Sequence, residues 1–176
     1  PFLPGNGEPL LLAVGRLTAQ KNFPNLINAF SLVKQTRAAK LVILGEGEER
    51  ENLTELIASL GLEQEVLMPG FVDNPYAWMR RADVFVLSSS WEGLPTVLIE
   101  ALACGAKVVS TDCPSGPKEI LENGRWGELV KMDDSKALAS GIIKTLSEAQ
   151  TESLEKRLEV FSIKYATDRY LETLKL

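Results

Sequence analysis

Two glutamates, Glu92 and Glu100, flank a short turn and are separated by seven residues. The turn contains Gly93 and follows Val84–Leu87, an apolar run of the length expected for a buried strand. After Pro95, apolar residues recur at helical spacing. The first turn of a helix exposes unpaired N–H groups and a partial positive charge. We therefore expect an anion-binding turn between two carboxylates.

Two cations follow an earlier apolar run. Arg16 and Lys21 come just after Leu10–Val14, the first predicted strand, and stand five residues apart in a polar loop. In an open α/β sheet, ligands bind beyond the carboxyl ends of the strands, so both cations can reach the same crevice as the turn at 93–97. Arginine binds phosphate oxygens bidentately and lysine acts as a point charge. Each cation alone would be an ordinary surface charge, but together they suit a diphosphate.

The two glutamates are expected to differ in environment. Glu100 is flanked by apolar residues on a predicted, largely buried helix, where a lone carboxylate is costly unless it meets hydrogen-bond donors. A salt bridge or a cap to a neighbouring loop would supply them, and so would the hydroxyls of a ribose, which we favour. Glu92 taken alone is an exposed loop charge. Trp91 is expected to be a packing residue rather than a stacking platform.

Two glycine-bearing loops have open interpretations. Gly45-Glu46-Gly47 precedes a helical segment, but Arg50 stands where a dinucleotide-binding G-x-G-x-x-G motif has its third glycine. A tight strand-to-helix turn is therefore the favoured interpretation. The loop 113–117 places Ser115 and Gly116 between two prolines. It either presents backbone N–H groups to an anion or simply turns the chain.

Strand-like and helix-like segments alternate along the chain. Strands are predicted at 10–14, 41–44, 66–68, 84–87, 107–111 and 127–130. Helices are predicted at 22–37, 53–60, a short segment from 73, 95–105, 118–121, 134–146, 151–161 and 164–175. Asn22 is the expected cap of the first helix, and Gly61 the left-handed end of the second. Parallel neighbours need crossovers, so the order predicts an α/β, three-layer α/β/α domain over 1–176, with a mostly parallel sheet of about six strands and C-terminal helices at 151–176.

Composition excludes several classes of protein. The 176 residues (19.3 kDa) are 45% hydrophobic and 24% charged, as in a globular domain, and no apolar run could span a bilayer. The net charge of −5 argues against a general nucleic-acid binder. Cys104 and Cys113 lack metal-ligand spacing and are expected to be reduced thiols. The chain has no histidine, so these residues contain no histidine base.

The beginning of the chain suggests a fragment. It opens almost directly with a strand and has no initiating methionine. There is also no positively charged segment followed by an apolar core, so we expect a cytoplasmic protein.

With these motifs assembled, the sequence resembles the C-terminal, nucleotide-sugar-binding half of a retaining GT-B glycosyltransferase of glycosyltransferase family 4 (group 1). The resemblance covers about Leu10 to Leu146 and rests on the E-x7-E element from Glu92 to Glu100, with Gly15-Arg16 and Lys21-Asn22. It implies a Rossmann-like domain that binds a nucleotide diphosphate sugar, with a UDP-sugar favoured. The full enzyme would move a hexosyl group to a glycan, lipid or other acceptor with retention.

The resemblance also implies roles for individual residues. The implied donor-binding residues are Gly15, Arg16, Lys21, Gly70, Phe71, Glu92, Gly93, Leu94, Pro95, Thr96 and Glu100. Among them, Arg16 and Lys21 would bind the diphosphate and the loop amides at 93–96 the distal phosphate. Glu100 would bind the ribose, Glu92 would face the transferred sugar, and the loop 70–72 would contact the nucleobase. Glu92, Arg16 and Lys21 are the implied catalytic residues.

Other implications concern partners and alternatives. No metal or other cofactor is expected, because cations and helix N–H groups can offset the diphosphate charge and no Asp-x-Asp motif is present. The N-terminal acceptor domain and its usual histidine are missing, so this piece should bind donor without turnover. The full-length protein would act on a glycan or lipid, and peripheral association with the cytoplasmic face of the membrane is an option that the resemblance leaves open. A nucleotide-sugar epimerase, a dehydrogenase domain and a non-catalytic nucleotide-binding module are the alternatives.

Overall fold

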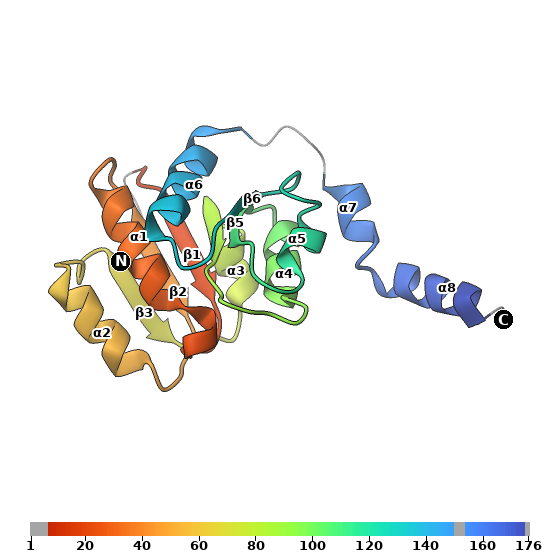
Figure 1. The fold of residues 1–176 in the computed structure, drawn as a ribbon, viewed down its shortest axis with the longest axis horizontal. Helices are drawn as coiled ribbons and strands as arrows, with labels where there is room; N and C mark the ends of the chain where they lie inside the picture. Colours follow the sequence, from red (N-terminus) through yellow and green to blue (C-terminus); the bar gives the residue numbers. More distant parts are fainter. Residues whose placement is uncertain (1–6, 150–153, 175–176) are drawn as a thin grey trace.

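The computed structural model describes residues 7–149 and 154–174 and contains one six-stranded sheet with helices on both faces (Figure 1). The strands are β1 (Leu10–Val14), β2 (Lys40–Leu44), β3 (Val66–Gly70), β4 (Val84–Leu87), β5 (Lys107–Thr111) and β6 (Glu128–Val130). The helices are α1 (Phe23–Lys34), α2 (Arg50–Ser59), α3 (Pro75–Met79), α4 (Thr96–Ala103), α5 (Pro117–Ile120), α6 (Ser135–Ser147), α7 (Glu155–Glu159) and α8 (Ile163–Leu174). A 3₁₀ turn, η1 (Ala19–Lys21), precedes α1. The predicted Rossmann-like α/β fold is confirmed.

The strands are all parallel and follow the order β3-β2-β1-β4-β5-β6. The chain therefore builds outward from β1 to one edge, then returns to β4 and builds to the other. The order reverses between β1 and β4, so the loops after these two strands diverge and leave a crevice at their carboxyl ends. This is where the sequence places both cations and the E-x7-E element.

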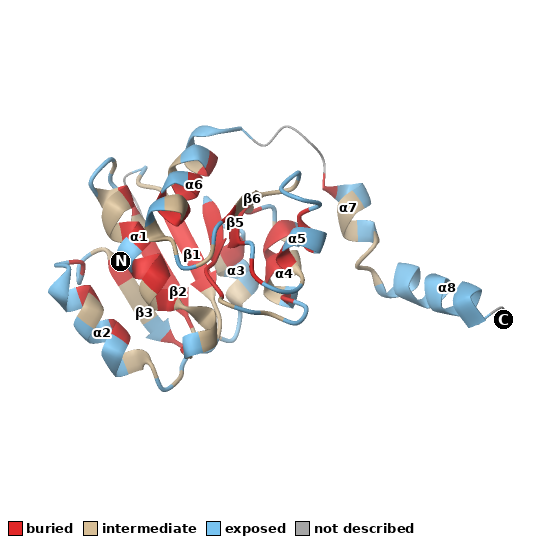
Figure 2. Cartoon of the chain, viewed as in Figure 1, coloured by how far each residue is buried: buried red, intermediate tan, exposed pale blue. Residues whose placement is uncertain are grey.

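Alternate side chains of each strand enter separate core layers. In β1, Leu11 and Ala13 join the layer with α1, α2 and α6, whereas Leu10 and Leu12 join the layer with α3, α4 and α5. Each of these four side chains is at most 1% exposed to solvent. Figure 2 shows that buried residues fill the strands and the sheet-facing sides of the helices. A strand that is apolar on both faces is typical of a doubly covered parallel sheet, and this is why the strands were recognisable.

Several boundaries differ from the sequence prediction, and those of β3 and α1 have a clear physical reason. β3 continues through Pro69 to Gly70, although the prediction ended it at residue 68. Because β3 is an edge strand, the missing N–H of proline need not cost a ladder hydrogen bond. α1 ends at Lys34, three residues before the predicted end, and the N–H groups of Thr36 and Arg37 close a turn onto Val33.

The two C-terminal helices differ: α7 packs on the body of the domain, and α8 extends away from it (Figure 1). α7 is tied to α5 by Arg157, whose Nε donates to the Ile120 carbonyl oxygen at 2.8 Å. α8 is exposed along its whole length, including Ile163, Tyr170 and Leu174 (Figure 2). The predicted helices at 151–161 and 164–175 thus correspond to α7 and α8, with positions 151–153 and 175 lying outside the described residues. None of the helices in 7–149 or 154–174 is long and apolar enough to cross a bilayer.

Gly45 joins the loops that follow β1 and β2. Its N–H donates to the Gly70 carbonyl oxygen at 2.9 Å, and its φ of +142° is a conformation that side chains rarely allow. A Cβ atom here would collide with the carbonyl group of Gly15. The Gly45-Glu46-Gly47 segment is therefore a tight turn, as favoured from the sequence, and it holds the backbone next to Arg16.

We expect Gly45→Ala to destabilise the domain by on the order of 3 kcal/mol, because strain and overpacking add. Gly61→Ala is the matched control, since Gly61 has a φ of +66° but no atom within 4 Å of the added Cβ. It should cost about 1 kcal/mol. Urea unfolding followed by circular dichroism measures both values. Equal losses would contradict the close approach of the two loops.

Candidate donor site

A cavity of about 500 Å³ opens at the carboxyl ends of β1 and β4, where the strand order reverses. It is lined by Val14, Gly15, Arg16, Thr18, Gln20, Lys21, Glu92, Leu94, Pro95, Thr96, Val97 and Glu100. The structure thus brings together both predicted cations, both glutamates and the turn that precedes α4. The sequence separates these two groups by more than 70 residues, and the pairing of β1 with β4 joins them.

The loops after β1 and β4 are held together by five polar contacts. These are Ser88 Oγ to the Lys21 carbonyl oxygen (2.7 Å), Ser90 N–H to the Gln20 carbonyl oxygen (2.9 Å), Gln20 Nε2 to the Trp91 carbonyl oxygen (2.9 Å), Asn22 Nδ2 to Ser90 Oγ (3.2 Å) and Lys21 Nζ to Glu92 Oε1 (2.6 Å). The two walls of the cavity therefore form one connected unit.

Glu92 is not the exposed loop charge that its sequence context suggests. Its side chain is only 7% exposed and pairs with Lys21, which is 16% exposed. Oε1 accepts from Lys21 Nζ and from Ser89 Oγ, each at 2.6 Å. Ser89 is fully buried, and its carbonyl oxygen accepts from Thr111 Oγ1 at 2.6 Å. The carboxylate is thus anchored through one oxygen, by two donors from different elements.

The loop 113–117 supports the backbone of Glu92. The Glu92 N–H donates to the Pro114 carbonyl oxygen at 2.8 Å, and the Ser115 N–H donates back to the Glu92 carbonyl oxygen at 3.4 Å. Gly116 has a φ of +93°, and a Cβ there would press into Pro95. Of the two interpretations left open for this loop, the one in which it turns the chain holds for Ser115, whereas the Gly116 N–H has no acceptor within the described residues. The Ser115 N–H is engaged within the protein.

The turn before α4 has unpaired N–H groups, and two of the residues that carry them, Leu94 and Val97, line the cavity. Within the described residues, the N–H groups of Gly93, Leu94 and Val97 have no acceptor, whereas that of Thr96 donates to the Leu94 carbonyl oxygen at 2.8 Å. Pro95 has no N–H group to offer. The predicted set of amides at 93–96 therefore changes: Thr96 is engaged through its backbone and Val97, which the sequence reasoning missed, is available.

Arg16 and Glu100 are the two charged residues of the cavity without an internal partner. Arg16 is exposed and Glu100 half-buried, and neither side chain makes a hydrogen bond or ion pair within 7–149 or 154–174. Glu100 is carried by α4, whose buried face is formed by Leu98, Ala101 and Leu102. The salt bridge or loop cap considered for Glu100 is absent there. Its carboxylate remains able to accept hydrogen bonds in the cavity.

A second, more apolar cavity of about 330 Å³ adjoins the first. It is lined by Val14, Gly15, Arg16, Leu44, Gly45, Glu46, Phe71, Val72 and Pro75. Three of these residues, from Val14 to Arg16, also line the first cavity. Phe71 is 79% exposed, an unusual state for a phenylalanine and one that leaves its ring free for a ligand. The predicted nucleobase loop thus lies at the rim of an apolar groove continuous with the cation site.

One sequence prediction near the site is wrong, and another is confirmed for the position of the residue but not for its capping bond. Trp91 does not pack inside, since it is 53% exposed on the loop after β4. Asn22 occupies the N-cap position of α1, but its side chain makes no capping bond because its φ is +47°. Its Nδ2 instead donates to Asp133 Oδ1 at 2.6 Å, in addition to Ser90. The exposure of Trp91 and the tertiary hydrogen bonds of Asn22 depend on how distant loops meet, which the local sequence pattern does not encode.

Both cysteines are free, as predicted. Burial raises the pKa of the Cys113 thiol, with Glu92 adding to the shift and a hydrogen bond with Thr111 opposing it. Burial also raises the pKa of Cys104. Because nucleophilic attack requires the thiolate, neither environment activates a cysteine.

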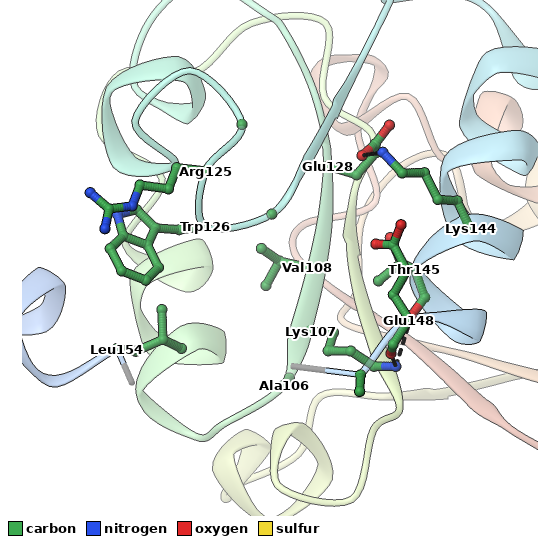
Figure 3. Close-up of a pocket in the computed structure, with 13 residues that line it drawn as sticks. Ala106, Lys107, Val108, Arg125, Trp126, Glu128, Lys144, Thr145, Glu148 and Leu154 are labelled. Carbon is green, nitrogen blue, oxygen red and sulfur yellow. Dashed lines mark hydrogen bonds and ion pairs between the residues drawn. The ribbon is translucent and has the colours of Figure 1, made fainter. Parts of the chain in front are cut away.

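Another cavity, of about 250 Å³, lies at the amino-terminal edge of the sheet beside β5, β6 and the end of α6 (Figure 3). Lys107 Nζ points to the end of α6 and donates to the carbonyl oxygens of Thr145 (2.7 Å) and Glu148 (2.9 Å). Lys144 pairs with Glu128 at 2.7 Å. The two lysines of this cavity thus hold α6 to the sheet. The cavity lies at the amino ends of the strands, whereas the E-x7-E element lies at their carboxyl ends.

The chain belongs to the glycosyl transferases group 1 family, whose model matches residues 2–161. Its fold is the Rossmann-like half of the GT-B glycosyltransferases. Its structure resembles that of the lipopolysaccharide outer core galactosyltransferase WaaB in its apo form, with a TM-score of 0.83 and 26% sequence identity. The match covers 98% of this chain and 51% of the WaaB chain. A mutant of S. aureus TarM, in complex with fondaparinux, α-GlcNAc-glycerol and UDP, matches at 0.81 and 25% identity, over 96% and 35%.

Curated relatives agree with this assignment. The N-acetylgalactosamine-N,N'-diacetylbacillosaminyl-diphospho-undecaprenol 4-alpha-N-acetylgalactosaminyltransferase of Campylobacter jejuni is 42% identical over 141 residues, which are 80% of this chain and 38% of that protein. The lipopolysaccharide core biosynthesis glycosyltransferase LpsE of Rhizobium meliloti is 34% identical over 172 residues, 94% of this chain and 49% of that protein. The chain thus spans less than half the length of these relatives.

The Lys21–Glu92 pair makes a prediction about stability. Lys21→Met leaves the enclosed Glu92 carboxylate without its cation and should destabilise the domain by on the order of 3 kcal/mol. Adding Glu92→Gln removes the uncompensated charge, so the double variant should recover part of the loss. Urea unfolding of the two single variants and the double variant measures the coupling. Strictly additive losses would show that the pair carries no coupling energy.

Proposed function

We propose that this chain is the donor-binding part of a glycosyltransferase that uses a nucleotide diphosphate sugar, and that a UDP-sugar is the donor. The observation that carries the proposal is the pair of continuous cavities at the β1/β4 switch point, one bearing Arg16 and free N–H groups and the other apolar. A diphosphate suits the first and a nucleobase the second. The UDP bound in the structurally similar TarM complex supports the choice of nucleotide.

Each cavity residue takes a role in this proposal. Arg16 binds the diphosphate, and the N–H groups of Gly93, Leu94 and Val97 bind the distal phosphate at the positive end of α4. Glu100 accepts hydrogen bonds from the ribose hydroxyls, which are the donors its carboxylate lacks. Phe71 lies against the nucleobase.

The chemistry asked of these groups is electrostatic. Transfer breaks the bond between the anomeric carbon and the phosphate oxygen, and the bonding electrons leave with the diphosphate. Arg16 and Lys21 offset this growing negative charge, and the α4 amides act in the same direction. Because protein groups supply this stabilisation, we propose a metal-independent reaction. The acceptor hydroxyl forms the new bond to the anomeric carbon, and its proton passes to the departing diphosphate oxygen. We propose that it attacks the face that the diphosphate leaves, which retains the anomeric configuration.

The rest of the protein would supply the acceptor site. α8 presents Ile163, Tyr170, Leu171 and Leu174 to solvent, an apolar set that nothing in the described chain covers. We propose that this helix packs against an N-terminal acceptor domain, and that the acceptor is a glycan or lipid, handled at the cytoplasmic side of a membrane. The printed names of the two bacterial relatives, which concern lipid-linked and lipopolysaccharide sugars, support this class of acceptor.

Titration calorimetry tests the donor site. UDP should bind the chain, Arg16→Ala should weaken it by about tenfold or more, and Glu100→Ala by about tenfold, because each removes a charged hydrogen-bond partner. Arg81→Ala is the control, since Arg81 is an exposed cation just before β4, at the opposite edge of the sheet. UDP binding that ignores Arg16 and Glu100 would contradict the proposal. NAD binding in place of UDP would favour a dehydrogenase domain.

Stereochemistry tests the reaction. The full-length protein, supplied with a UDP-α-sugar that binds this domain and with its acceptor, should form an α-linked product, which proton NMR of the anomeric signal detects. A β-linked product would contradict retention. Conversion of the UDP-sugar to its epimer without an acceptor would favour the epimerase, and binding without any turnover of the full-length protein would favour a non-catalytic module.

A further inference from the structure

Glu92 is the carboxylate of the cavity whose orientation is most constrained. Its backbone is tied to Pro114 and Ser115, and its Oε1 accepts from both Lys21 and Ser89. The other oxygen, Oε2, has no donor within the described residues. Within the described residues, the buried side-chain polar atoms without a hydrogen-bond partner are Asn25 Nδ2 and Trp126 Nε1. Oε2 of Glu92 also has no partner but is not buried, so solvent reaches it. Since Glu92 lines the cavity, this free oxygen is the one available to a ligand.

The two groups that donate to Oε1, Lys21 Nζ and Ser89 Oγ, differ in how firmly the protein holds them when a ligand binds. Lys21 Nζ is a mobile cation on a flexible stem, and in the proposed function it also attracts the diphosphate. Ser89 is fully buried at the end of β4, and Thr111 Oγ1 holds its carbonyl oxygen at 2.6 Å. Ser89 therefore keeps its hydroxyl in place when the lysine ammonium turns toward phosphate. It is the fixed partner of the carboxylate.

We infer that Ser89 is a positioning residue: its hydroxyl fixes Oε1 of Glu92 so that Oε2 faces the cavity and accepts a hydrogen bond from a hydroxyl of the transferred sugar. The inference rests on the proposed function, because it needs a nucleotide sugar in this cavity. Ser89 itself is buried and does not touch the sugar. Its effect is confined to the sugar end of the donor, whereas Arg16, Glu100 and the α4 amides serve the nucleotide end.

The test compares the affinities of UDP-sugars with that of UDP. The chain is titrated with UDP and with UDP-glucose, UDP-N-acetylglucosamine and UDP-N-acetylgalactosamine, and the ratio of each dissociation constant to that of UDP is taken. Ser89→Ala should raise this ratio by about tenfold for the sugars that bind, because the carboxylate loses its fixed orientation. The UDP affinity should stay within about twofold. A general loss of packing would instead weaken UDP and UDP-sugar alike.

The matched control is Ser110→Ala. Ser110 is also fully buried at the carboxyl end of a central strand, but its hydroxyl donates to the Thr111 carbonyl oxygen and makes no contact with Glu92. Its removal should leave the ratio unchanged. Ser89→Cys is the second variant at the site, a conservative change that replaces the hydroxyl by a weaker donor. Ser89→Cys should shift the ratio in the same direction but by less than Ser89→Ala. It replaces Ser89→Ala in the test if that variant does not fold.

A double-variant cycle shows whether Ser89 acts through Glu92. Glu92→Gln should raise the ratio by itself, because an amide N–H replaces an accepting oxygen. Adding Ser89→Ala to Glu92→Gln should then produce no further change. Additive effects of the two substitutions would overturn the inference, and so would an unchanged ratio in Ser89→Ala. A chain that binds UDP but none of the three UDP-sugars would also overturn it. In those cases the nucleotide site stands, whereas absence of UDP binding would overturn the proposed function itself.

Discussion

The ion pair between Lys21 Nζ and Glu92 Oε1 is the contact on which the crevice depends, because it closes the gap between two loops that diverge from neighbouring strands. An enclosed charge is costly without a partner, so each residue of the pair stabilises the other there. Four hydrogen bonds between residues 20–22 and 88–91 fix the distance at which the pair meets. The parallel pairing of β1 with β4 makes that distance possible, and thus fold and site share one constraint.

The same pair divides the work among the charged groups of the cavity. Lys21 is already partly neutralised by Glu92, whereas the side chain of Arg16 has no partner in the described part of the chain. A ligand diphosphate would therefore draw first on Arg16 and on the free amides before α4. Glu92 in turn is held by one oxygen and offers the other. The proposed anion site would thus lie beside an unpaired carboxylate oxygen, a combination that suits a phosphorylated sugar better than a plain phosphate.

The sequence predicted the features that depend on local pattern. Six apolar runs became six parallel strands, because strands buried on both faces, such as β1 and β4, must be apolar throughout. The positions of Arg16, Glu92 and Glu100 at one crevice followed from the rule that parallel strands end at the same edge. The contacts within the crevice did not follow, since they depend on how loops far apart in sequence meet. Trp91 was expected to pack inside but is exposed, and the enclosure of Glu92 by Lys21 and Ser89 could not be read from its loop sequence.

The backbone of the α4 turn shows the same limit at atomic scale. Residues 93–96 have the composition of an anion-binding turn, yet the Thr96 N–H closes onto the Leu94 carbonyl oxygen and the Val97 N–H is free. Pro95 produces this arrangement, because its φ of −73° and ψ of 81° are those of an inverse γ-turn, in which the Thr96 N–H reaches the Leu94 carbonyl oxygen. Gly116 packs against the same proline and keeps it there. The loop 113–117 therefore uses its Ser115 amide to support Glu92 and leaves room through Gly116 for the proline that shapes the α4 turn.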